Sequence, residues 1–127
     1  MIIGTGIDIV EIERFGKAVE KWGENFLKKV FTDNEIAYSR NRRFSEQHFA
    51  ARFATKEAVF KAFGGGGDIR KWTDIEVLND DAGRPLIAFH GSAEKLRKDR
   101  RVSNVIVSMS HSHGHAVANA ILVAEKE

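Results

Sequence analysis

The chain has 127 residues, of which 43% are hydrophobic and 30% charged; these proportions are typical of a soluble globular protein, exclude intrinsic disorder, and with the length predict one domain over residues 1–127. Lys and Arg number 20 and Asp and Glu 18, and the net charge of +2 is too small by itself to indicate a nucleic-acid binder. Cys is absent, which excludes disulfides, thiol catalysis and thiolate metal sites.

The apolar runs in the sequence are too short for a membrane span, which needs roughly 20 residues. The first residues are strand-like and acidic, and they lack the basic start and apolar core of a secretory signal. We therefore expect a cytoplasmic protein whose partners include neither a membrane nor nucleic acid.

The first elements are a strand and a helix. The β-branched residues of segment 2–10 predict a buried strand. Apolar residues then recur with helical spacing from Phe15 to Trp22 and predict one face of a helix. A neighbouring face carries a basic stripe of Arg14, Lys17 and Lys21. A solvated helix face and a surface for an acidic partner are both consistent with this stripe.

Two further helices precede the glycine run. Thr32 and Glu35 have the spacing of a capping box, which predicts a short helix ending near Ser39. Ser45 is the predicted N-cap of the longest helix, about residues 46–63, which the glycine run then ends.

The second half of the chain alternates strands with turn formers. Segments 73–78 and 86–89 predict a hairpin, and 92–101 predicts a short charged helix. Segments 102–109 and 116–123 predict a second hairpin. Strands joined by short turns are antiparallel, so the predicted fold is α+β, with an antiparallel sheet packed against one long and several short helices.

Asp8 is the first candidate for chemistry. It lies between Ile7 and Ile9 in the apolar first strand. A buried, unpaired carboxylate there would cost several kcal/mol, so it needs a compensating cation or a set of hydrogen-bond donors. The alternative is an acid at a strand end that is exposed or bonded to loop amides.

Glu57 is the second candidate. It lies with Lys61 beside the apolar stripe of the long helix, and Ala54 and Ala50 continue the same strip. Small residues there would let another segment or a ligand approach the carboxylate. The alternative is an ordinary i,i+4 Glu–Lys pair. Lys56 falls within the Phe stripe, where packing of its stem is the favoured interpretation.

The run Gly64–Gly67 directly follows the long helix. Glycines allow a close approach of the backbone, and such a loop can turn amide protons toward phosphate oxygens. It is equally consistent with a helix stop and a connector, since the sequence lacks the lysine pattern of a Walker phosphate loop.

The last candidates are three alternating histidines, His111, His113 and His115. In an extended segment all three would face one side, which is compatible with a zinc or nickel site. The favoured alternative is a strand end rich in hydrogen-bonding groups.

Five segments together resemble holo-acyl-carrier-protein synthase, the small bacterial phosphopantetheinyl transferase. They occur in the family's order and span nearly the whole chain: Gly4-Thr5-Gly6-Ile7-Asp8-Ile9-Val10-Glu11-Ile12, Phe31-Thr32-Asp33-Asn34-Glu35, Arg52-Phe53-Ala54-Thr55-Lys56-Glu57-Ala58-Val59-Phe60-Lys61-Ala62, Trp72-Thr73-Asp74-Ile75-Glu76-Val77 and Val107-Ser108-Met109-Ser110-His111-Ser112.

This resemblance implies an Mg²⁺-dependent enzyme that transfers the 4′-phosphopantetheine group of coenzyme A to a serine of an apo carrier protein, releasing adenosine 3′,5′-bisphosphate. It assigns Asp8 and Glu57 to the metal, and Glu57 and Lys61 to catalysis, with the serine proton passing to Glu57 or to a water on the metal. The donor types agree, since Mg²⁺ prefers one or two carboxylates together with waters and phosphate oxygens. The substrate-binding residues it implies are Lys61, Gly64, Gly65, Arg84, Pro85, Ser110 and His111.

The resemblance also implies partners. Because the family's carriers are small and acidic, Arg14, Lys17 and Lys21 would dock them. The family is typically a homotrimer with active sites at subunit interfaces, so one subunit's Asp8 and Glu57 are expected to meet substrate groups from a neighbour. Two alternatives stay open: a non-enzymatic basic module that binds an acidic protein or RNA, and a histidine-based metal hydrolase.

Overall fold

The computed structural model describes residues 1–65 and 68–125. Its elements, in chain order, are β1 (Ile2–Glu11), α1 (Ile12–Val30), α2 (Asp33–Arg40), α3 (Ser45–Ala62), a 3₁₀ turn η1 (Trp72–Asp74), β2 (Ile75–Asn79), β3 (Pro85–Phe89), α4 (Gly91–Asp99), β4 (Val102–Ser112) and β5 (His115–Ala124). None of the described helices is both long and apolar enough to cross a membrane.

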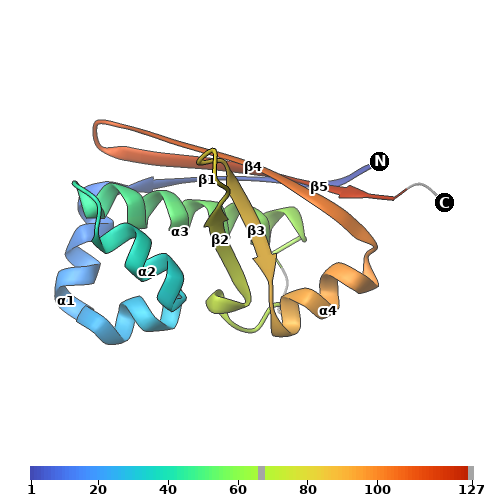
Figure 1. Cartoon of the computed structure of the whole chain (residues 1–127), viewed down its shortest axis with the longest axis horizontal. Coiled ribbons are helices and arrows are strands. Elements are labelled where there is room, and N and C mark those ends of the chain that lie inside the picture. Colours follow the sequence, from blue (N-terminus) through green and yellow to red (C-terminus); the bar gives the residue numbers. More distant parts are fainter. Residues whose placement is uncertain (66–67, 126–127) are drawn as a thin grey trace.

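The strands form two antiparallel sheets. The larger has the order β1-β5-β4, and β2 and β3 form a separate hairpin. Figure 1 shows the larger sheet as one layer, with the helices and the β2–β3 hairpin all on one side of it. The predicted α+β class and antiparallel pairing are confirmed.

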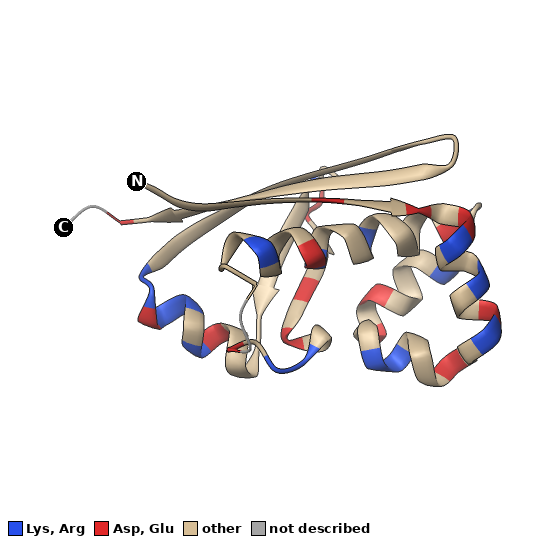
Figure 2. Cartoon of the chain, turned by 180° about the vertical axis from the view of Figure 1, so that it is seen from behind, with Lys and Arg blue, Asp and Glu red and all other residues tan. Residues whose placement is uncertain are grey.

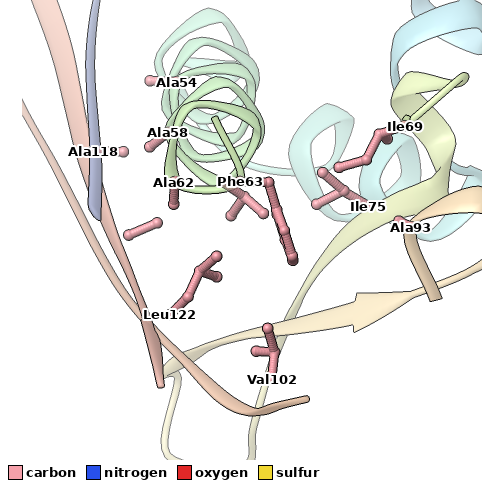
Figure 3. Close-up of a cluster of buried hydrophobic side chains, with 12 residues drawn as sticks. Ala54, Ala58, Ala62, Phe63, Ile69, Ile75, Ala93, Val102, Ala118 and Leu122 are labelled. Carbon is pink, nitrogen blue, oxygen red and sulfur yellow. The ribbon is translucent and has the colours of Figure 1, made fainter. Parts of the chain in front are cut away.

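Helix α3 lies directly against the sheet because both surfaces are built from small residues. A Cβ atom added to Gly6 would lie 1.9 Å from the carbonyl oxygen of Ala58, and one added to Gly4 would lie 2.1 Å from that of Ala62. Two glycines at alternate positions of β1 thus let the strand touch the helix backbone. In Figure 3 the alanines of α3 point toward the sheet, and Phe63 fills the space toward the β2–β3 hairpin.

A second buried cluster joins α1, α2 and α3 around Phe15, Phe31 and Phe49. The predicted capping box is present: the hydroxyl of Thr32 accepts from the amide of Glu35, whose carboxylate accepts from the amide of Thr32. That carboxylate is fully buried and also pairs with Lys56. Lys56 therefore does more than pack its stem on the Phe stripe.

The prediction that the first strand is buried is wrong for one of its faces. Ile7 and Ile9 are each 65% exposed, and Ile106 of β4 is 52% exposed on the same outer side of the sheet. A strand presents alternate residues to opposite faces, and the helices cover only the inner face. The outer face consequently exposes these isoleucines beside polar residues such as Asn119 and Ser108, and the helices leave it uncovered.

Two helix boundaries also differ from prediction. Ser45 is the first residue of α3, and the N-cap is Phe44, which has a left-handed backbone and makes no side-chain capping bond. In α1, Gly23 has φ of +65° and interrupts the helix. Trp22, the last residue of the predicted apolar face, is 61% exposed, so the buried face of α1 does not extend to it.

Candidate active site

Asp8 lies on the inner side of β1, two residues after Gly6, where the strand meets α3. Its Oδ1 atom is 2.9 Å from the Nζ atom of Lys61, which also donates to the carbonyl oxygen of Ile7 at 3.0 Å. The side chain of Asp8 is only 16% exposed, and that of Lys61 is 50% exposed. The compensating cation predicted for Asp8 is thus Lys61.

Glu57 lies one turn before Lys61 on α3 and borders the same cavity as Asp8. The ion pair of Lys61 is with Asp8, so the predicted alternative of a Glu57–Lys61 pair is wrong. Burial raises the pKa of Glu57, the Asp8 carboxylate raises it further, and Lys61 partly opposes both. Asp8 and Glu57 are therefore close enough to interact electrostatically, although they lie 49 positions apart in the sequence.

The cavity at this acid pair has a volume of about 470 Å³. Its floor is apolar, with Phe15, Phe26 and Phe53, and Arg14 of the basic stripe reaches it. Lys17 and Lys21 lie farther along α1, and Lys17 is paired with Glu13 at 3.3 Å. In Figure 2, α1 carries basic positions interspersed with acidic ones, so the stripe is one face of a mixed surface.

The donor set fits a hard divalent cation. Within residues 1–65 and 68–125, no group of three or more His, Asp or Glu side chains is arranged to hold a metal. Asp8 and Glu57 supply two carboxylates beside open space, which suits Mg²⁺, an ion that keeps several waters and takes substrate phosphate oxygens as further ligands.

A second cavity, of about 520 Å³, lies on the other side of Glu57 and Lys61. It is bordered by Gly65, Phe60 and Trp72. Gly64 and Gly65, with φ of +96° and +67°, follow α3, and of these two predicted substrate residues Gly65 borders the cavity beside Glu57 and Lys61. The rest of the predicted glycine loop, residues 66–67, lies outside the described residues.

The remaining predicted substrate residues lie elsewhere. Pro85, Ser110 and His111 border a third cavity, of about 310 Å³. Arg84 is exposed in the turn next to it, where its amide bonds to Asp80 at 2.8 Å. The sequence analysis missed three further side chains of this cavity, Tyr38, His48 and Arg52.

Positive charge dominates this third cavity. The guanidinium groups of Arg42 and Arg52 lie 3.6 and 3.8 Å from the ring centre of Tyr38. Burial alone would raise the pKa of Tyr38, but hydrogen bonding and the charges of the two arginines outweigh it and lower the pKa. Burial, then these arginines, lower the pKa of His48. Such a cavity favours an anionic ligand.

In one chain the acid pair and the third cavity lie at opposite edges of the sheet. Asp8 of β1 pairs with Ala118 of β5, and Ala118 pairs on its other side with Met109 of β4. Two strand spacings separate the edges by roughly 10 Å. On α3, Arg52 and Glu57 are five positions and hence about 140° apart. The predicted site residues therefore form two groups, which one chain does not bring together.

The three histidines do not share one face. His111 lies in β4, His113 lies in the turn with φ of +50°, and His115 begins β5. The chain reverses between them, so their alternation in sequence does not place them on one side of an extended segment. The ring of His111 instead approaches that of His48, 6.3 Å away between centres.

Comparison with known proteins gives a consistent result. The model of the ACPS family, the 4′-phosphopantetheinyl transferase superfamily, matches residues 4–120. A holo-[acyl-carrier-protein] synthase from Geobacter sulfurreducens is 45% identical over 123 residues, which cover 96% of this chain and 98% of that protein.

Solved structures agree with the sequence match. The holo-[acyl-carrier-protein] synthase of Neisseria meningitidis superposes with a TM-score of 0.88 at 29% identity, covering 97% of this chain and 99% of that one. That of Bacillus anthracis, in complex with CoA (3′,5′-ADP), has a TM-score of 0.80 at 34% identity, covering 98% and 99%.

Proposed function

The chain belongs to the 4′-phosphopantetheinyl transferase superfamily, and we propose that it transfers the 4′-phosphopantetheine group of coenzyme A to a serine of an apo acyl carrier protein. The observation that carries this function is the convergence of Asp8, Glu57 and Lys61 on one cavity in a chain matched by the family over nearly its full length. A binding module alone has no need of two carboxylates beside an ammonium group at the mouth of a cavity.

Asp8, Glu57 and Lys61 each have a role in the proposed reaction. Asp8 and Glu57 would hold Mg²⁺, which when bound neutralises the diphosphate of coenzyme A. The serine oxygen forms a bond to the β-phosphorus, the bond from that phosphorus to the bridging oxygen breaks, and adenosine 3′,5′-bisphosphate leaves. Lys61, already an ion-pair donor here, meets the charge that develops on the phosphates. Glu57 is the proposed acceptor of the serine proton, because its carboxylate borders the same cavity as Asp8 and Lys61.

The nucleotide end of coenzyme A is assigned to the cationic third cavity, with Pro85, Ser110 and His111 on its border. Since this cavity lies at the sheet edge opposite the acid pair, a complete site requires the acid edge of one subunit beside the cationic edge of another. The exposed isoleucines on the outer face of β1 and β4 support such an assembly. A homotrimer closes these contacts with one site per interface.

The acidic carrier docks on Arg14, Lys17 and Lys21 in this proposal. Arg14 borders the acid cavity, so a carrier lying along α1 would deliver its serine to the acid pair. The cytoplasmic location predicted from the sequence fits a coenzyme A-dependent reaction and stays a prediction.

The test is direct. Purified protein is incubated with coenzyme A, Mg²⁺ and apo acyl carrier protein, and mass spectrometry measures phosphopantetheine on the carrier. We expect complete conversion by the parent protein, loss of at least about 100-fold in rate for Asp8→Asn, and loss of activity when EDTA replaces Mg²⁺. Absence of the adduct on several carriers, with salt-sensitive carrier binding retained, would favour the basic binding module instead.

A further inference from the structure

Lys56 immediately precedes Glu57 on α3, and its side chain is fully buried. The ammonium Nζ atom is 2.6 Å from Oε1 of Glu35, 2.8 Å from the carbonyl oxygen of Val30 and 3.1 Å from that of Trp72. An ammonium group has three protons, and here three acceptors surround it. The proposed reaction uses neither Lys56 nor Glu35.

Glu35 completes a junction between elements. Its Oε1 atom also accepts from the amide of Thr32 at 2.9 Å, and its Oε2 atom accepts from the amide of Val77 at 2.8 Å. The ion pair thus ties the end of α1, the N-terminus of α2, the η1 turn and β2 to one turn of α3. That turn carries Glu57.

The same ammonium fixes the aromatic wall around Glu57. Trp72, held through its carbonyl oxygen, packs its ring 5.2 Å from that of Phe53 and 4.8 Å from that of Phe60. These phenylalanines lie four positions before and three positions after Glu57. Phe53 borders the cavity at the acid pair, Phe60 borders the cavity beyond it, and Glu57 borders both.

We propose that Lys56, through its buried ion pair with Glu35, is a positioning residue that fixes the carboxylate of Glu57 relative to Asp8. The inference rests on the proposed function. Buried ion pairs can often be replaced by uncharged side chains without loss of stability, so the fold alone does not require this one. A displacement of about 1 Å at a reacting group, by contrast, can cost about 100-fold in rate.

Two variants separate positioning from stability. Lys56→Met leaves a buried carboxylate without its cation, and we expect the Tm to fall by about 10 °C or more. In the double variant Glu35→Gln/Lys56→Met neither member of this ion pair is charged, and the side-chain oxygen of Gln can still accept from one of the two backbone amides that Glu35 binds. We expect its Tm within about 5 °C of the parent, but its kcat lower by roughly tenfold or more with KM for coenzyme A within about threefold.

A second readout does not depend on turnover. Amide hydrogen exchange over residues 54–61 of the metal-free protein should be faster in the double variant than in the parent, because the α3 turn has lost its anchor. The matched control is Glu94→Gln/Arg97→Met, which removes a partly exposed ion pair on α4. It should change neither kcat nor exchange in α3.

Parental kcat and parental exchange in the folded double variant would show that the ion pair is structural only and would overturn the proposal. If the double variant does not fold, Glu35→Asp keeps both charges but draws the ammonium away from its carbonyls. A parental kcat in that variant would likewise overturn it. An inactive parent would refute the proposed function, whereas an active parent with an equally active double variant refutes only the positioning role.

Discussion

Two carboxylates, Asp8 and Glu57, lie beside one ammonium group, that of Lys61, which pairs with Asp8. With both acids ionised, these three side chains carry one net negative charge. That imbalance is costly in a partly buried site, because the Asp8 carboxylate disfavours ionisation of Glu57. In the proposed function, the same imbalance would attract a divalent cation. At the level of single residues, stability without metal and readiness to bind metal are therefore in opposition.

This opposition predicts how the stability of the protein depends on pH. The pKa of Glu57 is raised in the folded protein, so folding favours its protonated form. Protonated Glu57 therefore stabilises the folded protein below the pKa of an unfolded glutamate, about 4.3. This stabilisation is lost as the pH rises through the pKa of Glu57 in the folded protein. Glu57→Gln should accordingly melt about 3 °C above the metal-free parent at pH 8.

Thermal melts from pH 4 to pH 8, monitored by circular dichroism, test this expectation. The difference between Glu57→Gln and the parent should vanish toward pH 4, and Mg²⁺ should raise the Tm of the parent but not of the variant. A metal-free parent that melts above Glu57→Gln at pH 8 would contradict the assigned interaction with Asp8.

The contact between β1 and α3 decides where these residues meet. Gly6 lies against the carbonyl oxygen of Ala58. This position of β1 along α3 places Asp8, two residues later, beside Lys61. Among the strands of the described residues, β1 is at the edge of the larger sheet and pairs with β5. Its position on the helix therefore depends on the absence of side chains at its glycines.

Gly6→Ala should destabilise the protein by about 3 kcal/mol and lower transferase activity by more than the loss of folded protein explains, because the new methyl group pushes β1 and Asp8 away from α3. The matched control is Gly16→Ala in α1, where an added Cβ would have Glu46 at an ordinary 3.5 Å. That substitution should stabilise the helix by about 0.5–1 kcal/mol. Urea unfolding measures both; equal stability of Gly6→Ala and the parent would refute the close contact.

At the scale of the whole molecule, the proposed assembly would account for two features of the single chain: the separation of the acid pair from the third cavity, and the exposed isoleucines on the outer face of the sheet. An assembly of copies would cover the exposed Ile7, Ile9 and Ile106 and bring the acid pair of one subunit to His111 of the next. That residues 1–127 fold as one independent domain stays a prediction of the sequence.

Shared sites predict complementation between inactive variants. Asp8→Asn and His111→Ala are each assayed alone at a coenzyme A concentration below KM, then mixed in equal amounts, unfolded and refolded together. If every site takes Asp8 from one subunit and His111 from its neighbour, about a quarter of the sites in random mixed trimers regain both residues. Activity restored to roughly that fraction is the expected result, with light scattering to verify the trimer. Activity no higher than the average of the two variants would place both residues in one subunit.

The sequence alone determined the helices and strands, the antiparallel pairing and the acids of the candidate site. These follow from periodicity, caps and turn chemistry, which act over a few neighbouring residues, and from the resemblance of five short segments to one family. It also identified Asp8 as a charge in need of a cation, because burial of an unpaired carboxylate is costly wherever it occurs.

Only the tertiary structure decided which groups meet. Lys61 pairs with Asp8, 53 positions away, instead of with Glu57 one turn back, and Lys56 finds its partner in the capping residue Glu35. Tyr38, His48 and Arg52 border one cavity together with His111, although their spacing in the sequence does not predict this. These contacts depend on how β1 and the β4–β5 hairpin pack on α3, and on which face of the sheet the helices leave uncovered. Both are properties of long-range packing, which local sequence patterns do not encode.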